Sequence, residues 1–201
     1  MAPINEAMAR DWPQATRMNL LDDSLSADVA AGTGLDSAMH QRFERLAQYA
    51  IECGSDAILF TCSAFGPCIE EVAQRHAPLP VLKPNEAMLA DAAAAGVRVG
   101  LIATFEATLR SMPAEFPPGV PIECVLASGA LEALGAGDTH RHDELVAQAA
   151  REAARRGCGV IALAQFSMAR AHRAVAVATG LPVLTTVDSS VAMLKRRLRV
   201  P

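Results

Sequence analysis

Residues 54–62 read Gly-Ser-Asp-Ala-Ile-Leu-Phe-Thr-Cys, and residues 157–165 read Gly-Cys-Gly-Val-Ile-Ala-Leu-Ala-Gln. Each stretch holds a short apolar run bounded by turn residues, which is the pattern of a buried β-strand. A helical segment follows each stretch, and the tetrapeptide Leu-Pro-Val-Leu then appears at residues 79–82 and again at residues 181–184. The chain therefore contains an imperfect internal repeat. Its two copies end in different side chains, a thiol and an amide.

Strands alternate with helices along most of the chain. Apolar residues recur at three- and four-residue steps from Ser37 to Glu52, which predicts an amphipathic helix. Strands are predicted at residues 57–61, 81–82, 97–103, 122–126, 160–164 and 183–184, with helices between them near residues 67–77, 86–95, 106–111, 143–155 and 168–178. This alternation predicts an α/β fold with parallel sheets, built as two pseudo-symmetric Rossmann-like lobes with a site in the cleft between them.

The repeat also divides the chain into lobes. We expect residues 1–84 together with residues 187–201 to form the first lobe, and residues 85–186 to form the second. The strand predicted from residue 97 has no complete counterpart in the first half. The first lobe is therefore expected to lack its opening strand, and an exposed sheet edge there would favour a homo-oligomer.

Composition excludes several classes of function. The chain has 201 residues, of which 51% are hydrophobic, and a formal net charge of −4 with both signs spread throughout. This distribution offers no electrostatic footprint for nucleic acid or an anionic membrane surface. The sequence has no apolar run of membrane-spanning length and no leader pattern, so we expect a cytoplasmic protein. Five cysteines without close pairing fit reduced thiols in that compartment.

Cys62 is the cysteine best placed for chemistry. It directly follows a predicted strand, and ligands of parallel α/β sheets bind beyond the carboxyl ends of the strands. The segment after it leads into a helix N-terminus, which favours an anion such as a thiolate or a substrate carboxylate. The alternative is an inert loop cysteine. The remaining cysteines are expected to be structural: Cys53, Cys68, Cys124 and Cys158.

Other polar residues carry weaker signals. Thr104 ends a predicted strand, where its hydroxyl would bind a carboxylate or cap the next helix. His140 and His142 are expected in a solvated loop before a helix beginning near Asp143, and no further donors converge on them to form a metal site. The chain has no glycine-rich phosphate loop after a strand. We therefore expect neither a cofactor nor a metal.

Taken together, these segments resemble the aspartate/glutamate/hydantoin racemase family, which also contains maleate isomerases and arylmalonate decarboxylases. The likeness spans nearly the whole chain and rests on residues 57–64, 99–104 with Thr108, 160–165 and 182–184. The resemblance implies two pseudo-symmetric α/β lobes and catalysis without pyridoxal phosphate or metal. In this family, one cysteine removes the α-proton of a bound amino acid, and a second cysteine on the opposite lobe returns a proton to the other face.

The resemblance also implies which residues form the site. It assigns the first catalytic cysteine to Cys62, and the second family cysteine corresponds to Gln165. An uncharged amide cannot act as a general acid or base near neutral pH, so two-base racemisation is not expected. The family's N-terminal substrate-binding motif is also largely absent. The substrate-binding positions implied are Ser63, Ala64, Thr104, Gln165 and Phe166.

The expected function is a cofactor-independent isomerase or lyase that acts on a small amino acid or carboxylic acid through Cys62. One thiol is compatible with three reactions: protonation of one face after decarboxylation, addition to an activated double bond followed by rotation, or racemisation in which water or another residue serves the second face. Two other classes stay open. One is a binding protein that kept the cleft without catalysis, and the other is a thiol hydrolase, although no histidine is placed beside Cys62 by the sequence.

Overall fold

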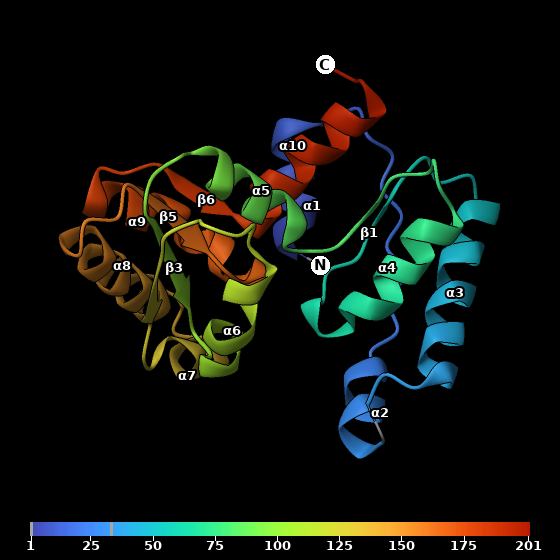
Figure 1. Ribbon diagram of the computed structural model, residues 1–201, viewed down its shortest axis with the longest axis horizontal. Coiled ribbons are helices and arrows are strands. Elements are labelled where there is room, and N and C mark those ends of the chain that lie inside the picture. Colours follow the sequence, from blue (N-terminus) through green and yellow to red (C-terminus); the bar gives the residue numbers. More distant parts are fainter. Residues whose placement is uncertain (1, 33) are drawn as a thin grey trace.

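The computed structural model describes residues 2–32 and 34–201. Figure 1 shows two lobes, each with a parallel sheet, and the helices α1 and α10 between them. The elements up to the end of the first sheet are α1 (Ala2–Asp11), α2 (Leu25–Ala31), α3 (Ser37–Glu52), β1 (Ile58–Leu59), the 3-10 turn η1 (Ser63–Phe65), α4 (Gly66–Arg75) and β2 (Val81–Leu82). The elements after it are α5 (Glu86–Ala94), β3 (Val99–Ala103), α6 (Glu106–Ser111), η2 (Met112–Glu115), β4 (Ile122–Leu126), α7 (Ala130–Gly135), α8 (Thr139–Arg155), β5 (Val160–Leu163), η3 (Phe166–Ala171), α9 (His172–Thr179), β6 (Val183–Thr185) and α10 (Thr186–Leu198).

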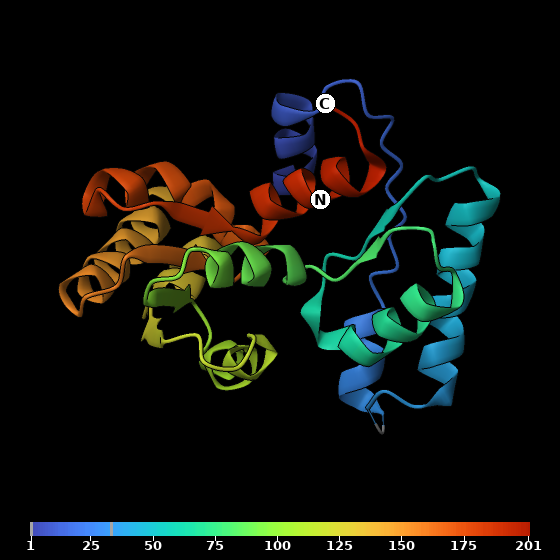
Figure 2. The same ribbon diagram turned by 45° about the horizontal axis from the view of Figure 1, so that its top comes forward.

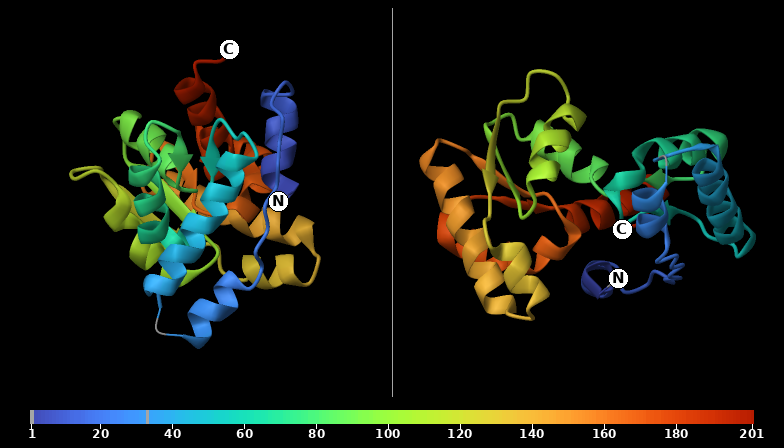
Figure 3. Two further views of the ribbon diagram at one scale, coloured as in Figure 1. Left: turned by 90° about the vertical axis from the view of Figure 1, so that its right-hand side faces the viewer. Right: turned by 90° about the horizontal axis from the view of Figure 1, so that it is seen from below.

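The larger sheet has the strand order β4-β3-β5-β6, and all its strands are parallel. Its two central strands are wholly buried, as expected for a parallel sheet covered on both faces. Ile102 and Leu163 pack into a core with residues of α8 and α9, whereas the neighbouring Leu101 and Ala162 pack into a core with α5 and η2. Figure 3 shows these helices on the two sides of the sheet.

Helix α8 lies unusually close to β3 because residue 100 has no side chain. A Cβ atom on Gly100 would lie 2.8 Å from Cβ of Ala153 and 3.0 Å from Cδ1 of Ile161. Glycine inside a strand often marks such an approach of another element. The small residues Gly100 and Ala153 therefore set the distance between the helix and the sheet.

The smaller sheet has two parallel strands, β1 and β2, with Ile58 paired to Val81. A two-stranded sheet is marginal by itself, so this lobe depends on the apolar faces of α3 and α4. The Phe43 ring lies at the centre of their core, with its centroid 5.3 Å from that of Phe60 and 4.9 Å from that of Phe65. The expected absence of an opening strand from this lobe remains a prediction.

An apolar cluster connects the two lobes. Its buried members are Ile4 and Ala7 from α1 and Val187 and Val191 from α10. Leu59 of β1 and Phe166 of η3 pack against this cluster from opposite lobes. The chain itself crosses between the lobes through the segment that leads from β2 into α5 (Figure 2). The two copies of the internal repeat therefore both end near residues that pack against this one apolar cluster.

Some expectations from the sequence differ from the structure. The helix expected near residue 143 begins at Thr139, because Asp138 caps its N-terminus by accepting from the N–H of Arg141. His142 is therefore fully buried inside a helix, and the expectation of a solvated loop was wrong. Cys53 and Cys124, expected to be packed, are exposed. Among the described residues, no helix is long and apolar enough to cross a membrane.

Candidate functional site

Cys62 lies beyond the carboxyl end of β1 and immediately before η1. Its backbone is extended, with φ −128° and ψ 122°, and the residue is exposed. The chain then turns through η1 into α4, which begins at Gly66 and Pro67. The first N–H groups of a helix have no intrahelical partners and favour an anion. Cys62 is thus an accessible thiol a few residues before a site that can hold negative charge.

Thr104 and Gln165 lie together at the carboxyl ends of β3 and β5, two paired strands of the larger sheet. Oε1 of Gln165 accepts a hydrogen bond from the backbone N–H of Thr104 at 2.7 Å and another from its hydroxyl at 2.9 Å. A backbone N–H can only donate, so the atom facing it must be the amide oxygen. Both donors of Thr104 are therefore occupied, and the Nε2 group of Gln165 is the polar atom left to meet a ligand.

Ser63 and Ala64 line a pocket between the lobes, which we call the interlobe pocket. Its volume is about 290 Å³. First-lobe residues of η1 and α4, the Lys83–Asn85 segment, and second-lobe residues of α6 and η2 form its walls. Cys62, Thr104 and Gln165 do not line it. The substrate-binding positions implied by the resemblance thus fall into two groups. Ser63 and Ala64 lie along this pocket, and Thr104 and Gln165 lie at the carboxyl ends of the two central strands of the larger sheet. Phe166 packs against the apolar cluster between the lobes.

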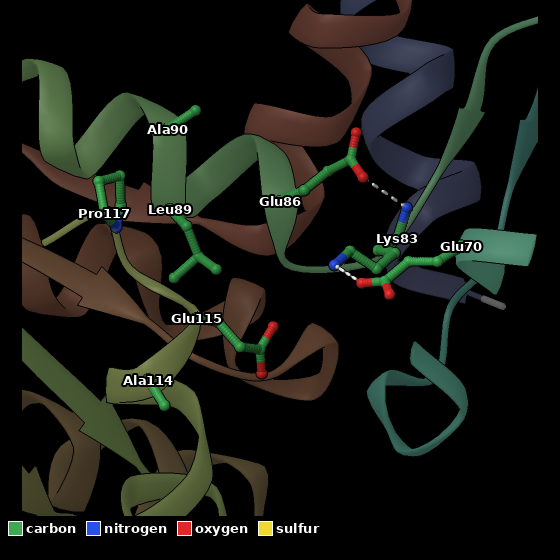
Figure 4. Close-up of a pocket in the computed structure, with 8 residues that line it drawn as sticks. All are labelled: Glu70, Lys83, Glu86, Leu89, Ala90, Ala114, Glu115 and Pro117. Atoms are coloured by element: carbon green, nitrogen blue, oxygen red, sulfur yellow. Dashed lines mark hydrogen bonds and ion pairs between the residues drawn. The ribbon is translucent and has the colours of Figure 1, made fainter. Parts of the chain in front are cut away.

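A second, adjoining cavity of about 390 Å³ extends along α5 and is here called the lateral pocket (Figure 4). The two pockets share Glu70, Lys83 and Glu115. Nζ of Lys83 donates to Oε1 of Glu70 at 2.5 Å. Burial lowers the pKa of Lys83, but its hydrogen bond to Glu70 and the nearby carboxylates outweigh burial and raise that pKa. Lys83 is therefore a protonated, positively charged side chain that lines both pockets.

Glu115 differs from the other carboxylates of these pockets. Glu70 is bonded to Lys83, and Glu86 accepts from Nη2 of Arg197 at 3.0 Å. Among the described residues, the carboxylate of Glu115 forms no ion pair, and the side chain of Asn85 is close enough to stabilise its charged form. Glu115 is an exposed residue, yet partial desolvation at the pocket wall raises the pKa of its carboxyl, and the charge of Lys83 and the amide of Asn85 only partly offset this rise.

The sequence analysis missed Lys83, Asn85 and Glu115. A signal was available for the first two, because they directly follow β2 and thus lie beyond the carboxyl end of a parallel strand, as Cys62 does. Glu115 carried no such signal, since it comes from the turn η2 after a helix. Among the described residues, no group of three or more His, Cys, Asp or Glu side chains is arranged to hold a metal ion.

The buried cysteines are poor candidates for chemistry. Burial raises the pKa of Cys68, assisted by the charge of Glu71, and burial also raises the pKa of Cys158. Both side chains are almost fully enclosed in apolar cores. A thiol held in its neutral form is a weak nucleophile and base. Both cysteines therefore have the packing role expected from the sequence.

Comparison with known proteins identifies the family. The sequence pattern of the Asp/Glu/hydantoin racemases matches residues 1–194. Glutamate racemase from Francisella tularensis, solved with D-glutamate, is 16% identical with a TM-score of 0.67, and the match covers 98% of this chain and 76% of that chain. Allantoin racemase from Klebsiella pneumoniae is 22% identical with a TM-score of 0.60, covering 80% and 66% of the two chains.

A mutant of arylmalonate decarboxylase, solved with sulfate, is 19% identical with a TM-score of 0.64, covering 86% of this chain and 79% of that one. No curated protein matches the sequence significantly. At these identities the solved structures show a shared fold, two lobes with parallel sheets, and the family pattern covers nearly the whole sequence. The chain therefore belongs to the Asp/Glu/hydantoin racemase family.

Proposed function

We propose that this chain is a cofactor-independent isomerase that acts at the α-carbon of a small amino acid or carboxylic acid through Cys62. The observation that carries the proposal is the exposed thiol directly beyond the carboxyl end of β1. Strand β1 also packs, through Leu59, on the same apolar cluster as Phe166, the neighbour of Gln165. Membership of a racemase family supports an isomerase-type reaction for that thiol.

In the proposed reaction, the thiolate of Cys62 takes the proton from Cα of the substrate. The electron pair left on Cα delocalises into the adjoining carboxylate, which becomes enolate-like, and donors around those oxygens stabilise the developing charge. The hydroxyl of Ser63 and the first N–H groups of α4 are available for this on the first lobe. On the second lobe the available donor is Nε2 of Gln165, because its Oε1 holds both donors of Thr104.

Gln165 makes the two faces of the substrate unequal. An amide neither releases nor takes a proton near neutral pH, so it cannot replace a second catalytic thiol. Proton return by Cys62 restores the original configuration, whereas inversion needs a proton from water or another residue on the opposite face. We therefore propose that exchange of the α-proton is faster than inversion. The same single thiol would also suit a decarboxylase or a cis-trans isomerase of this family.

The test is turnover of a panel of amino and dicarboxylic acids by the wild-type protein, Cys62→Ala and Cys53→Ala. Cys53 is the matched control, because it is exposed and lies at the end of α3, before β1. We expect Cys62→Ala to abolish turnover and α-proton exchange, and Cys53→Ala to keep both. Full activity in Cys62→Ala would remove this thiol from the mechanism.

A non-catalytic carboxylate-binding protein is the second candidate function. It is favoured by the contact in which Gln165 occupies both donors of Thr104, the residue expected to hold substrate oxygens. If no compound of the panel turns over but some raise the unfolding temperature, binding without catalysis is the better description. Measurable exchange of an α-proton would exclude this alternative.

A further inference from the structure

A fully buried histidine lies near the start of α8. His142 has 0% of its surface exposed, and its Nδ1 atom lies 2.7 Å from Oδ1 of Asp143. An ionised carboxylate only accepts, so Nδ1 carries the hydrogen and donates it. Nε2 of the ring has no partner among the described residues. Within that part of the chain, the carboxylate of Asp143 is therefore the one side-chain group that satisfies this imidazole.

The same carboxylate also binds the 3-10 helix η3. Its Oδ1 atom accepts from Nε of Arg170 at 2.9 Å, and only 22% of the Asp143 side chain is exposed. Ion pairs between exposed side chains contribute little to stability. Asp143 differs from such a pair, because its loss would also leave the buried N–H of His142 without an acceptor. The carboxylate is thus held by two donors, one from α8 and one from η3.

The position of η3 in turn affects Gln165. Gln165 directly precedes η3, and its carbonyl oxygen accepts from the N–H of Met168 at 2.9 Å. The side chain of Gln165 extends to Thr104, where Oε1 accepts from both the N–H and the hydroxyl. A displacement of η3 relative to the sheet would therefore carry Gln165 away from Thr104.

η3 depends on its neighbours for a fixed position. It spans six residues, Phe166–Ala171, and 3-10 helices longer than three or four residues are uncommon because their hydrogen bonds have poor geometry. Near its start, Phe166 packs on the apolar cluster between the lobes, and near its end Arg170 bonds to Asp143. Apolar packing is not directional. The bond of Arg170 is directional, so it fixes the end of η3 against α8.

We propose that Asp143 and Arg170 are positioning residues that hold the side chain of Gln165 in place through η3. The buried His142 fixes the carboxylate of Asp143, and Arg170 transmits that constraint to η3. Neither positioning residue lines the interlobe pocket. The positional claim involves no reaction. Its effect on catalysis rests on the proposed function, in which Nε2 of Gln165 meets the substrate carboxylate.

The test is amide hydrogen exchange, measured by NMR on the protein without substrate. Exchange of the Thr104 N–H reports its hydrogen bond to Gln165. The reference is the N–H of Ala127, which donates to the carbonyl of Ala103 at 2.8 Å on the β4 side of β3, away from β5. General destabilisation of the lobe would accelerate both exchange rates together, whereas displacement of Gln165 would accelerate only that of Thr104.

Three variants change the positioning pair. We expect Arg170→Ala and Asp143→Ala to accelerate exchange at Thr104 about fivefold or more relative to Ala127, because the hydrogen bond to Gln165 opens more often. Arg170→Lys keeps a cation that can donate to Asp143, so its ratio of the two rates should stay within about twofold of the wild-type ratio.

Glu144→Gln is the matched control. Glu144 is an exposed carboxylate next to Asp143, and its ion pairs join it to His140 and Arg141 within α8. Removing its charge therefore changes the same helical turn without changing the contact with η3. The ratio of exchange rates in this variant should equal that of the wild type.

The result in Arg170→Ala decides the proposal. The Arg170 side chain is 40% exposed, so we expect this variant to fold even if Asp143→Ala does not, and circular dichroism verifies folding. No acceleration at Thr104, or equal acceleration at Thr104 and Ala127, would overturn the proposal. An Arg170→Lys protein that exchanges as fast as Arg170→Ala would also count against it.

The two proposals can fail separately. If Cys62→Ala loses turnover but Thr104 stays protected in Arg170→Ala, the proposed function stands and the positioning role is wrong. If Thr104 loses protection as expected but no compound of the panel turns over, the positioning role stands and the proposed function is wrong. Where both hold, Arg170→Ala should slow α-proton exchange about threefold or more, and Arg170→Lys should restore it.

Discussion

Replacing Gln165 with alanine removes one acceptor that serves two donors. Oε1 of Gln165 accepts from the N–H of Thr104 at 2.7 Å and from its hydroxyl at 2.9 Å. Thr104 is only 8% exposed, so water replaces the amide poorly. An unsatisfied buried donor costs about 1–3 kcal/mol, and the hydroxyl can rotate toward another acceptor whereas the N–H cannot. We therefore expect Gln165→Ala to lower the free energy of unfolding by about 1–3 kcal/mol.

Two companion variants separate the hydrogen bonds from other contacts of the side chain. Gln165→Glu keeps an oxygen that accepts from both donors, so its free energy of unfolding should lie within about 1 kcal/mol of the wild-type value. Thr104→Val removes the hydroxyl and keeps the backbone N–H, so we expect a loss of about 1 kcal/mol.

Urea unfolding followed by circular dichroism measures each of these free energies, and an unchanged slope verifies that the denatured state is unaffected. A double-mutant cycle of Thr104→Val and Gln165→Ala should give a coupling energy of about 0.5–1.5 kcal/mol. Additive effects of the two changes, or a Gln165→Ala protein as stable as the wild type, would refute the reasoning.

Three further predictions concern packing, protonation and thiol reactivity. Gly100→Ala brings a Cβ to 2.8 Å from that of Ala153 and should lower the free energy of unfolding in urea by about 1–3 kcal/mol; an unchanged value would contradict the close approach of α8. Burial raises the pKa of Glu115, so the folded protein binds this proton more tightly than the unfolded chain. The associated stability is present at low pH and lost as the pH rises through the folded pKa. Glu115→Gln should therefore flatten the pH profile of the unfolding free energy above about pH 4, and a profile identical to the wild type would count against this reasoning. A thiol reagent should label three of the five cysteines in the native protein, Cys53, Cys62 and Cys124, and mass spectrometry should find Cys68 and Cys158 labelled only after unfolding.

Much of the fold follows from local patterns in the sequence. The helix at Ser37–Glu52 was predicted with the bounds that the structure has, because its apolar residues repeat at helical spacing. The strand cores were also predicted, and the alternation of strands and helices was enough to predict parallel sheets in two lobes. The start of α8 was missed although Asp138 carried a capping signal, and the error hid the burial of His142.

The candidate site was less accessible to such patterns. The strand-end rule selected Cys62 and Thr104, and the internal repeat together with the family resemblance selected Gln165. The hydrogen bonds between Thr104 and Gln165, however, depend on β3 and β5 being neighbours. Nothing local indicates that pairing, because β4 intervenes in the sequence. The residues around the interlobe pocket were even less accessible to local sequence patterns. Asn85 precedes α5 and Glu115 lies in η2, and these two elements are brought together by the core that contains Met88 and Met112.

The claim that Cys62 serves one face of the substrate, while Gln165 leaves the other without an acid or base, is tested most directly by exchange in D₂O. Wild-type protein is incubated with single enantiomers of alanine, aspartate and glutamate. Proton NMR follows loss of the Cα proton, and chiral chromatography follows configuration. We predict that deuterium enters at Cα with retained configuration faster than the enantiomer appears. Exchange and inversion at equal rates would contradict the account.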